Sequence, residues 1–206
     1  MNKCIVIWVV IFLLMACKNN PNDVELAESD SAQAAHDMAE NDSLLLYKNE
    51  GTQWLAVNLK LKNTSWSNLQ LENSWNEDTL DLQPFTPTKE FYNDYSSLLH
   101  WSPDSSYIID MGSYGTIVVK DKNGKPTLEG GEPDTEISLI FPRQNQKARI
   151  MFGGPSSYFI DAQWIDNTQA MIVGTFDKED QKQDTLLWMI DVKDKLFRLY
   201  NFKQKR

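Results

Sequence analysis

Apolar and polar residues alternate with a period of two in many segments after residue 44. In residues 54–62, Leu55, Val57, Leu59 and Leu61 alternate with small or polar residues, as a half-buried strand requires. No stretch after residue 44 keeps a helical period for three turns, and turns rich in glycine, asparagine and aspartate separate the apolar segments. The pattern therefore predicts one all-β domain over residues 44–206. It predicts further strands around Leu69–Leu71 and at Tyr107–Asp110, Thr116–Val119, Glu136–Phe141, Ala148–Phe152, Tyr158–Trp164, Ala170–Phe176, Leu186–Val192 and Leu196–Phe202.

The beginning of the chain has a different pattern. Residues 1–3 include Lys3, and residues 5–14 are wholly apolar. Ten residues of helix rise about 15 Å, roughly half the hydrocarbon thickness of a bilayer, so this run is too short to span a membrane. It ends in Leu14-Met15-Ala16-Cys17, which resembles the lipobox of bacterial lipoproteins. The resemblance implies that residues 1–16 are an export signal and that Cys17 carries acyl chains at the start of the mature protein.

Residues 17–43 form an acidic segment between this signal and the β domain. The segment has seven acidic residues against Lys18, and few of its residues are large and apolar. Such a stretch buries too little surface to offset its ordering entropy, so we expect a lipidated, flexible tether. The alternative, which its alanines allow, is a helix over Asp23–Glu40. In lipoproteins an aspartate directly after the lipidated cysteine often signals retention at the inner membrane. Lys18 at that position favours the outer membrane, facing the periplasm.

The composition restricts the possible partners and the chemistry of the mature chain. Loss of Cys4 with the signal and lipidation of Cys17 leave no free thiol, so the domain has no disulfide. The chain has 20 basic and 29 acidic residues and a formal net charge of −9. Nucleic acid is therefore a poor partner, and a membrane is expected to bind through the lipid on Cys17.

Two segments of the β domain resemble each other. Residues 101–109 and 164–172 each begin with a tryptophan, continue through a polar pair (Asp104-Ser105 and Asn167-Thr168), and end in an apolar strand. An Asp or Asn side chain closes a tight turn by hydrogen bonding to backbone groups that follow it, and the next strand can then return against the indole. We therefore assign Trp101, Asp104, Trp164 and Asn167 to two equivalent structural turns and expect both tryptophans to be buried.

Trp101-Ser102-Pro103-Asp104 resembles the opening of the TolB-type β-propeller repeat, with Ser105 where that family usually has glycine. The second copy continues through Leu186–Leu199 as the outer hairpin of a blade would, and the first continues less fully through Thr116–Gly124. The two tryptophans are 63 residues apart, whereas a regular blade takes about 40–45 residues. The resemblance implies blade-like antiparallel meanders, a partial or small propeller-like arrangement, with a β-sandwich as the alternative.

Few residues of the domain could carry catalysis or bind a metal. His100 is its only histidine, and a zinc site normally needs several His or Cys ligands, so we expect no metal and no cofactor. Ser102 and Asp104, the neighbours that a triad would use, are explained by the turn. The acidic loop Glu129–Glu136 does not have the ligand spacing of an EF-hand, and Phe152–Ser157 lacks the lysine and helix of a phosphate-binding loop. Both are interpreted as turns.

Trp66 and Trp75 are the remaining candidates for ligand binding, because both lie among polar residues. Exposed indoles stack on sugar rings or anchor a protein partner. Trp66 lies three residues before Leu69, which favours exposure if one strand joins them, whereas Trp75 is expected to be buried.

Three functions remain open from the sequence. The first is a non-enzymatic cell-envelope lipoprotein that binds another protein through its β domain. The second is a glycan-binding lipoprotein that uses Trp66 and Trp75. The third is a hydrolase that relies on a pair of carboxylates.

Overall fold

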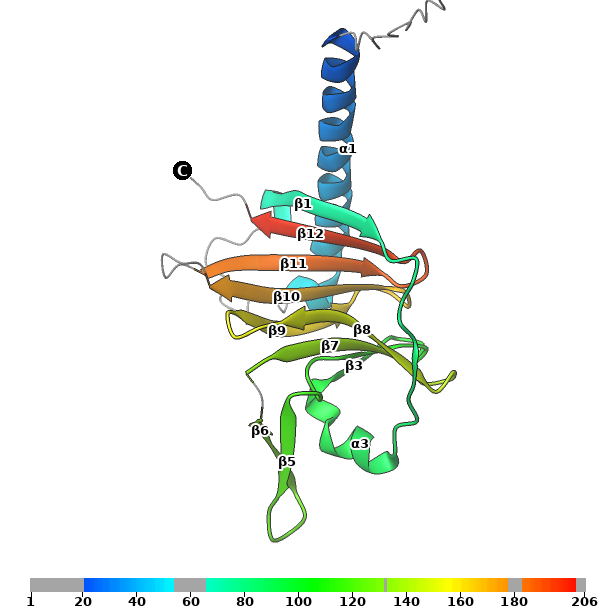
Figure 1. Ribbon diagram of the computed structural model, residues 1–206, viewed down its shortest axis with the longest axis vertical. Coiled ribbons are helices and arrows are strands. Elements are labelled where there is room, and N and C mark those ends of the chain that lie inside the picture. The colour runs from blue at the N-terminus through cyan, green and yellow to red at the C-terminus, as the bar shows by residue number, and fades with distance from the viewer. Residues whose placement is uncertain (1–20, 54–65, 132, 178–182, 203–206) are drawn as a thin grey trace, which may run out of the picture. The chain divides into compact units, whose positions relative to one another are not determined.

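The computed structural model describes residues 21–53, 66–131, 133–177 and 183–202 (Figure 1). The chain divides into two units, residues 1–34 and residues 35–206. Three features expected from the sequence lie outside the described residues: the export signal over residues 1–16, lipidation of Cys17 and the strand over residues 54–62. Within the described part, no helix is long and apolar enough to cross a membrane.

Helix α1 spans Pro21–Lys48. A flexible coil over residues 17–43 is therefore the wrong expectation from Pro21 onward, where the chain is helical. The second unit begins at Ala35, nine residues before the start predicted for the β domain. The physical reason is that Ala39, Asp42 and Leu46, spaced to lie on one side of the helix, are all buried in that unit.

The second unit is an antiparallel β structure, as the alternating pattern predicts. One five-stranded sheet, the first sheet, has the order β2-β8-β7-β4-β3, and the second sheet has the order β1-β12-β11-β10-β9. The strands of the first sheet are β2 (Gln83–Pro84), β3 (Leu99–Trp101), β4 (Ile108–Asp110), β7 (Thr135–Phe141) and β8 (Gln146–Gly153). Those of the second sheet are β1 (Leu69–Asn76), β9 (Ser157–Trp164), β10 (Gln169–Asp177), β11 (Gln183–Asp191) and β12 (Leu196–Phe202). A separate hairpin pairs β5 (Thr116–Lys120) with β6 (Pro126–Gly130).

Three hydrophobic clusters hold these elements together. The largest lies between the two sheets and includes Ile109, Leu139 and Ala148 from the first sheet and Trp164 and Ile172 from the second. A second cluster packs α1 and the 3₁₀ helix η1 (Trp66–Asn68) against the other face of the second sheet. A third packs the helix α3 (Lys89–Asp94) near the other face of the first sheet, and the 3₁₀ helix η2 (Ser96–Leu98) connects α3 to β3. Two facing sheets thus form the core, with a helix on each outer side.

Four consecutive strands of each sheet form equivalent meanders, β3-β4-β7-β8 and β9-β10-β11-β12. Trp101 ends β3 and pairs with Ile108, and Trp164 ends β9 and pairs with Ala170. Asp104 Oδ1 accepts a hydrogen bond from Ser106 N at 3.0 Å in the first turn. In the second turn the acceptor is Asp166 Oδ1, which binds Thr168 N at 2.7 Å. Asp166, and not the expected Asn167, is therefore the counterpart of Asp104, because the second turn is one residue shorter.

The second hairpin of each meander is also equivalent. Asn145 in the turn between β7 and β8 and Lys195 in the turn between β11 and β12 have φ values of 52° and 53°. The pairs that close these turns, Phe141 with Gln146 and Asp191 with Leu196, have the same spacing. The first meander therefore continues through β7 and β8, and the expected continuation through Thr116–Gly124 is wrong. Those residues belong to the β5–β6 hairpin. The segment that contains it, residues 111–134 between β4 and β7, accounts for 24 of the 63 residues that separate the two tryptophans.

The two sheets stack in the same orientation, so equivalent side chains of the two meanders point in the same direction. Trp164, Ala170 and Ile190 face the first sheet and are buried between the sheets. Their counterparts Trp101, Ile108 and Ile140 lie on the face of the first sheet that points away from the second. Ile108 and Ile140 are covered near α3. Trp164 is consequently 4% exposed and Trp101 is 44% exposed, so the expected burial of both tryptophans is wrong for Trp101.

Candidate interaction surface

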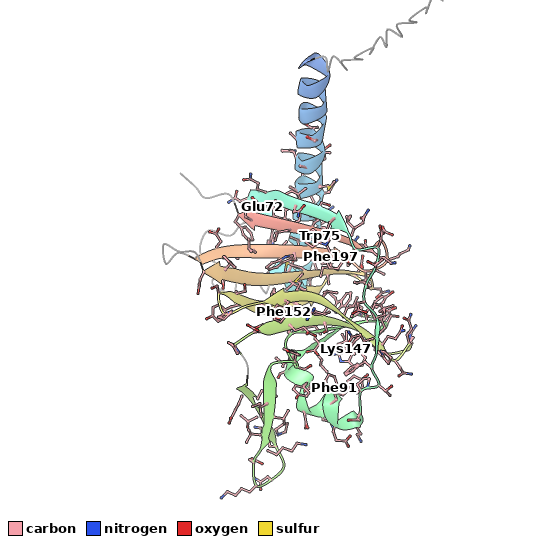
Figure 2. All side chains as sticks on the ribbon, in the orientation of Figure 1. Glu72, Trp75, Phe91, Lys147, Phe152 and Phe197 are labelled. Atoms are coloured by element: carbon pink, nitrogen blue, oxygen red, sulfur yellow. The ribbon has the colours of Figure 1, made fainter. Side chains whose placement is uncertain are left out.

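Trp66 and Trp75 do not form a shared surface. Trp66 is 7% exposed and packs in the cluster beneath α1, with its ring 6.2 Å from that of Phe202. Trp75 is half-buried and stacks on Phe197 at 5.6 Å, against the cluster between the sheets (Figure 2). The register of β1 shifts between Leu71 and Asn73, which turns the following side chains to the opposite face. The two indoles thus lie on opposite faces of the second sheet, and the expectation that Trp66 is exposed is wrong.

His100 lies at the edge of the first sheet, beside β9. Its Nε2 is 3.5 Å from Asp161 Oδ1, and its carbonyl oxygen accepts a hydrogen bond from Trp164 Nε1 at 2.8 Å. Burial lowers the pKa of His100, and the charge of Asp161 opposes that shift. Ser102 Oγ donates to Asp104 Oδ1 at 2.9 Å, so these two residues hold the turn together and do not align with His100 as a triad.

The first sheet buries two carboxylates, Asp110 and Glu136, and each has its own local partners. Asp110 Oδ1 accepts hydrogen bonds from the backbone of Gly112 and Ser113, while burial raises the pKa of its carboxyl group. Glu136 Oε1 accepts a hydrogen bond from Ser138 Oγ at 2.7 Å. Among the described residues, no three His, Cys, Asp or Glu side chains gather as metal ligands would. These carboxylates are held by structural hydrogen bonds.

A groove of about 480 Å³ lies along the part of α1 in the second unit. Its helical side is formed by residues spaced along one stripe of α1, and the other side by η1 and the start of β1. Two residues that line the groove, Ser43 and Trp66, are joined by a hydrogen bond from Ser43 Oγ to the carbonyl oxygen of Trp66 at 2.5 Å. The lining residues are His36, Ala39, Glu40, Ser43, Leu44, Tyr47, Trp66, Ser67 and Leu69.

A buried polar network joins α1 to the last strand of the second sheet. Asp42 Oδ2 accepts a hydrogen bond from the Tyr200 hydroxyl at 2.5 Å and lies 2.7 Å from Arg198 Nε. All three side chains are buried. Burial raises the pKa of Asp42, while Tyr200 and Arg198 favour its ionised form. The sequence does not reveal this network, because its members are far apart in the chain and Asp42 falls in the segment expected to be a tether.

The β5–β6 hairpin is the main structural difference between the two meanders. It lies between β4 and β7, and Figure 1 shows it extending away from both sheets. The corresponding strands of the second meander, β10 and β11, pair directly with each other over nine residues. Insertions in one copy of a repeated unit often form its binding face.

One face of this hairpin exposes two large apolar side chains. Ile117 is 56% exposed and Val119 is 41% exposed, and both point to the same side because their positions differ by two. They pair across the hairpin with Glu129 and Thr127, which are also exposed. A two-stranded sheet is marginally stable alone, so β-branched side chains left in solvent on it suggest that a partner covers them.

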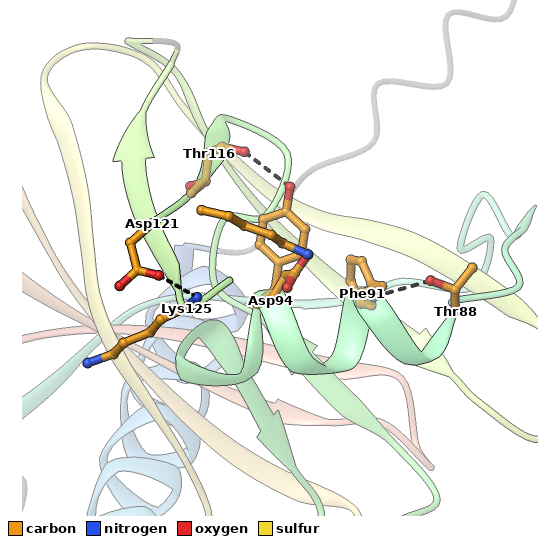
Figure 3. Close-up of polar contacts among 8 residues, drawn as sticks. Thr88, Phe91, Asp94, Thr116, Asp121 and Lys125 are labelled. Atoms are coloured by element: carbon orange, nitrogen blue, oxygen red, sulfur yellow. Dashed lines mark hydrogen bonds and ion pairs between the residues drawn. The ribbon is translucent and has the colours of Figure 1, made fainter. Parts of the chain in front are cut away.

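Helix α3 anchors the hairpin, as Figure 3 shows. The Tyr95 hydroxyl donates to the carbonyl oxygen of Thr116 at 3.2 Å, and Lys120 Nζ lies 2.9 Å from Asp94 Oδ2. At the start of α3, Thr88 Oγ1 accepts a hydrogen bond from Phe91 N at 3.2 Å, which caps the helix. These contacts hold the hairpin against α3, while the face that carries Ile117 and Val119 remains exposed.

The sequence did not single out this surface, although one signal for it was present. The interval of 63 residues between Trp101 and Trp164 exceeds the length of a blade by about the length of the inserted segment. Comparison with protein families, with curated proteins and with solved structures gives no match to this chain.

Proposed function

We propose that this protein is a non-enzymatic lipoprotein of the bacterial cell envelope whose β domain binds a partner protein through the β5–β6 hairpin. The observation that carries the proposal is the exposed pair Ile117 and Val119 on a hairpin that has no counterpart in the part of the second meander that the structure describes. The Leu14–Cys17 motif supports attachment through lipid on Cys17. Lys18 directly after it favours the outer membrane, with the domain facing the periplasm.

The first test concerns the anchor. In a Cys17→Ala variant we expect loss of acyl labelling and retention of the export signal, because the acceptor thiol and the cleavage motif are both removed. Metabolic labelling with a fatty-acid probe, followed by gel analysis, measures the labelling and the size of the chain. A variant that is still labelled at the wild-type level would show that lipid is attached elsewhere.

The second test concerns the partner. The photo-crosslinking residue p-benzoylphenylalanine is placed at Val119 in the full-length lipidated protein, in its native envelope. A matched protein carries it at Lys193, an exposed residue of the turn between β11 and β12. We expect a discrete crosslinked species from Val119 that is not formed from Lys193, because only the first position lies on the hairpin. The same products from both positions, or none from Val119, would contradict the proposal.

A further inference from the structure

The hydrogen-bond pattern of the β5–β6 hairpin determines which backbone groups point outward. Gly131 N donates to Gly115 O at 2.8 Å at its base, and Asp121 N donates to Lys125 O at 3.0 Å at its turn. Bonded and non-bonded pairs alternate in an antiparallel ladder. The bonded pairs between these two ends are therefore Ile117 with Glu129 and Val119 with Thr127. The backbone groups of Leu128 and Gly130 on β6, like those of Thr116 and Val118 on β5, point away from the partner strand.

The two outer edges of the hairpin differ. The edge of β5 lies against α3, where Thr116 O accepts a hydrogen bond from Tyr95 and Lys120 pairs with Asp94. The edge of β6 has no neighbouring strand among the described residues, because this sheet consists of β5 and β6 alone. Proteins usually shield such an edge with proline, charge or a covering element. Pro126 shields the turn end, while no strand among the described residues covers the donors at Leu128 and Gly130.

We propose that the open edge of β6 binds an extended segment of the partner protein by β-strand addition, and that this segment alternates apolar and basic residues. The inference rests on the proposed function and specifies how the hairpin would bind. Main-chain hydrogen bonds to Leu128 and Gly130 supply the contact that is independent of side chains, and the flanking side chains select the segment.

The side chains on the hairpin determine the chemistry of that segment. A strand beside β6 places every second residue next to Thr127 and Glu129, on the face that also exposes Ile117 and Val119. The residues between these lie on the opposite face, beside the half-buried Leu128, and the apolar positions of the segment are assigned there. The carboxylate of Glu129 favours a lysine or arginine opposite it. The basic residues of the hairpin, Lys120, Lys122 and Lys125, are confined to the turn end, so they do not neutralise its base. Like Glu129, the formal net charge of −9 for the whole chain favours binding of a basic segment.

Gly130 provides a test of the backbone contact. A Cβ atom built on Gly130 meets no atom within 4 Å, and its φ is not in the left-handed region. There is therefore room for a Cβ at this position, and Gly130→Pro removes the outward N–H without changing the charge of the protein. Gly130→Ala is the matched control, because it adds the Cβ and keeps the donor.

The probe is a short fluorescein-labelled peptide that alternates valine and lysine, and binding to the full-length protein is followed by fluorescence anisotropy. We expect the dissociation constant to rise at least about fivefold in Gly130→Pro, because a main-chain hydrogen bond is lost and the ring blocks the edge. Gly130→Ala is expected to stay within about twofold of wild type. A Gly130→Pro protein that binds the peptide as tightly as Gly130→Ala would overturn strand addition.

Glu129→Lys keeps the backbone intact and tests the choice of charge. Wild type is expected to prefer the valine–lysine peptide over a valine–glutamate peptide, and the variant is expected to lose or reverse that preference. An unchanged preference would overturn the assignment of the basic residue to Glu129. The Val119 crosslink separates this inference from the proposed function. If the crosslink persists in Gly130→Pro, the hairpin binds its partner by side chains alone. If it never forms in wild type, the proposed function itself is wrong.

Discussion

Replacement of Trp164 by alanine is expected to lower the free energy of unfolding by about 3–5 kcal/mol. Its indole is buried between the two sheets, lies 6.1 Å from the ring of Tyr107, and donates a hydrogen bond to His100 O. Truncation therefore leaves a cavity and an unsatisfied carbonyl group where the two sheets meet. Urea unfolding of the purified protein measures the effect.

Trp101→Ala is the matched control, because Trp101 occupies the equivalent turn of the first meander. Its ring lies 5.4 Å from that of Tyr92 and is nearly half exposed, so we expect a loss below about 1.5 kcal/mol. Equal losses at the two positions would contradict the packing direction derived for the meanders.

The second large effect is expected at the network that docks α1. Asp42→Ala should cost about 3–5 kcal/mol, because it leaves the guanidinium of Arg198 and the hydroxyl of Tyr200 buried without their acceptor. The same unfolding experiment measures the loss, and hydrogen exchange of residues 35–48 shows whether the helix separates from the sheet.

A double variant isolates the role of the buried charge. Asp42→Leu combined with Arg198→Met removes both charges and fills the space with apolar atoms, so the part of the loss caused by the unpaired charge should return, while the Tyr200 hydroxyl still lacks its acceptor. Asp37→Ala, on an exposed position of the same helix, should change stability by less than about 0.5 kcal/mol. If the double variant is as unstable as Asp42→Ala, desolvated charge is not the cause of the loss.

The alternating pattern was sufficient to predict most of the β structure. Segments such as Ala170–Phe176 and Leu196–Phe202 lie in observed strands, because burial of one or both faces leaves a clear apolar signal. The strands that the pattern missed are β2, β3 and β6. β2 has two residues and β3 has three, and β6 contains Pro126 and Gly130, which weaken a strand signal. Helix α3 has six residues, too few for a helical period to be recognised.

The positions of single side chains were less predictable. Strand alternation does not extend from Leu69 back to Trp66, because Trp66 belongs to a 3₁₀ helix. The irregular register of β1 places Trp75 on the face of the sheet opposite Leu69 and Leu71. Residues 35–43 are mostly polar, and only Ala39 and Asp42 of this stretch are buried where the helix packs against the second sheet. The partners of Asp42 lie more than 150 residues away, and no local pattern specifies a contact at that distance.

The hairpin was predicted only in part. A strand at Thr116–Val119 and a turn at Asn123-Gly124 follow from their residues, and Gly124 has the expected positive φ of 78°. Its role as an insertion depends on the equivalence of the two meanders, which becomes visible only when the turns at Asn145 and Lys195 are compared in space.

The pairing of β1 with β12 affects the order in which the chain can fold. The docked part of α1 and β1 lie near the start of the domain, whereas Arg198 and Tyr200 lie on its last strand, and 158 residues separate Asp42 from Tyr200. A chain that emerges from its N-terminus must therefore hold these segments without their partners until β12 has been synthesised. Contacts of such long sequence separation form slowly. A chain without β12 would leave β1 without its neighbouring strand and Asp42 without either partner, so one loss would affect two segments of the domain that are far apart in the sequence.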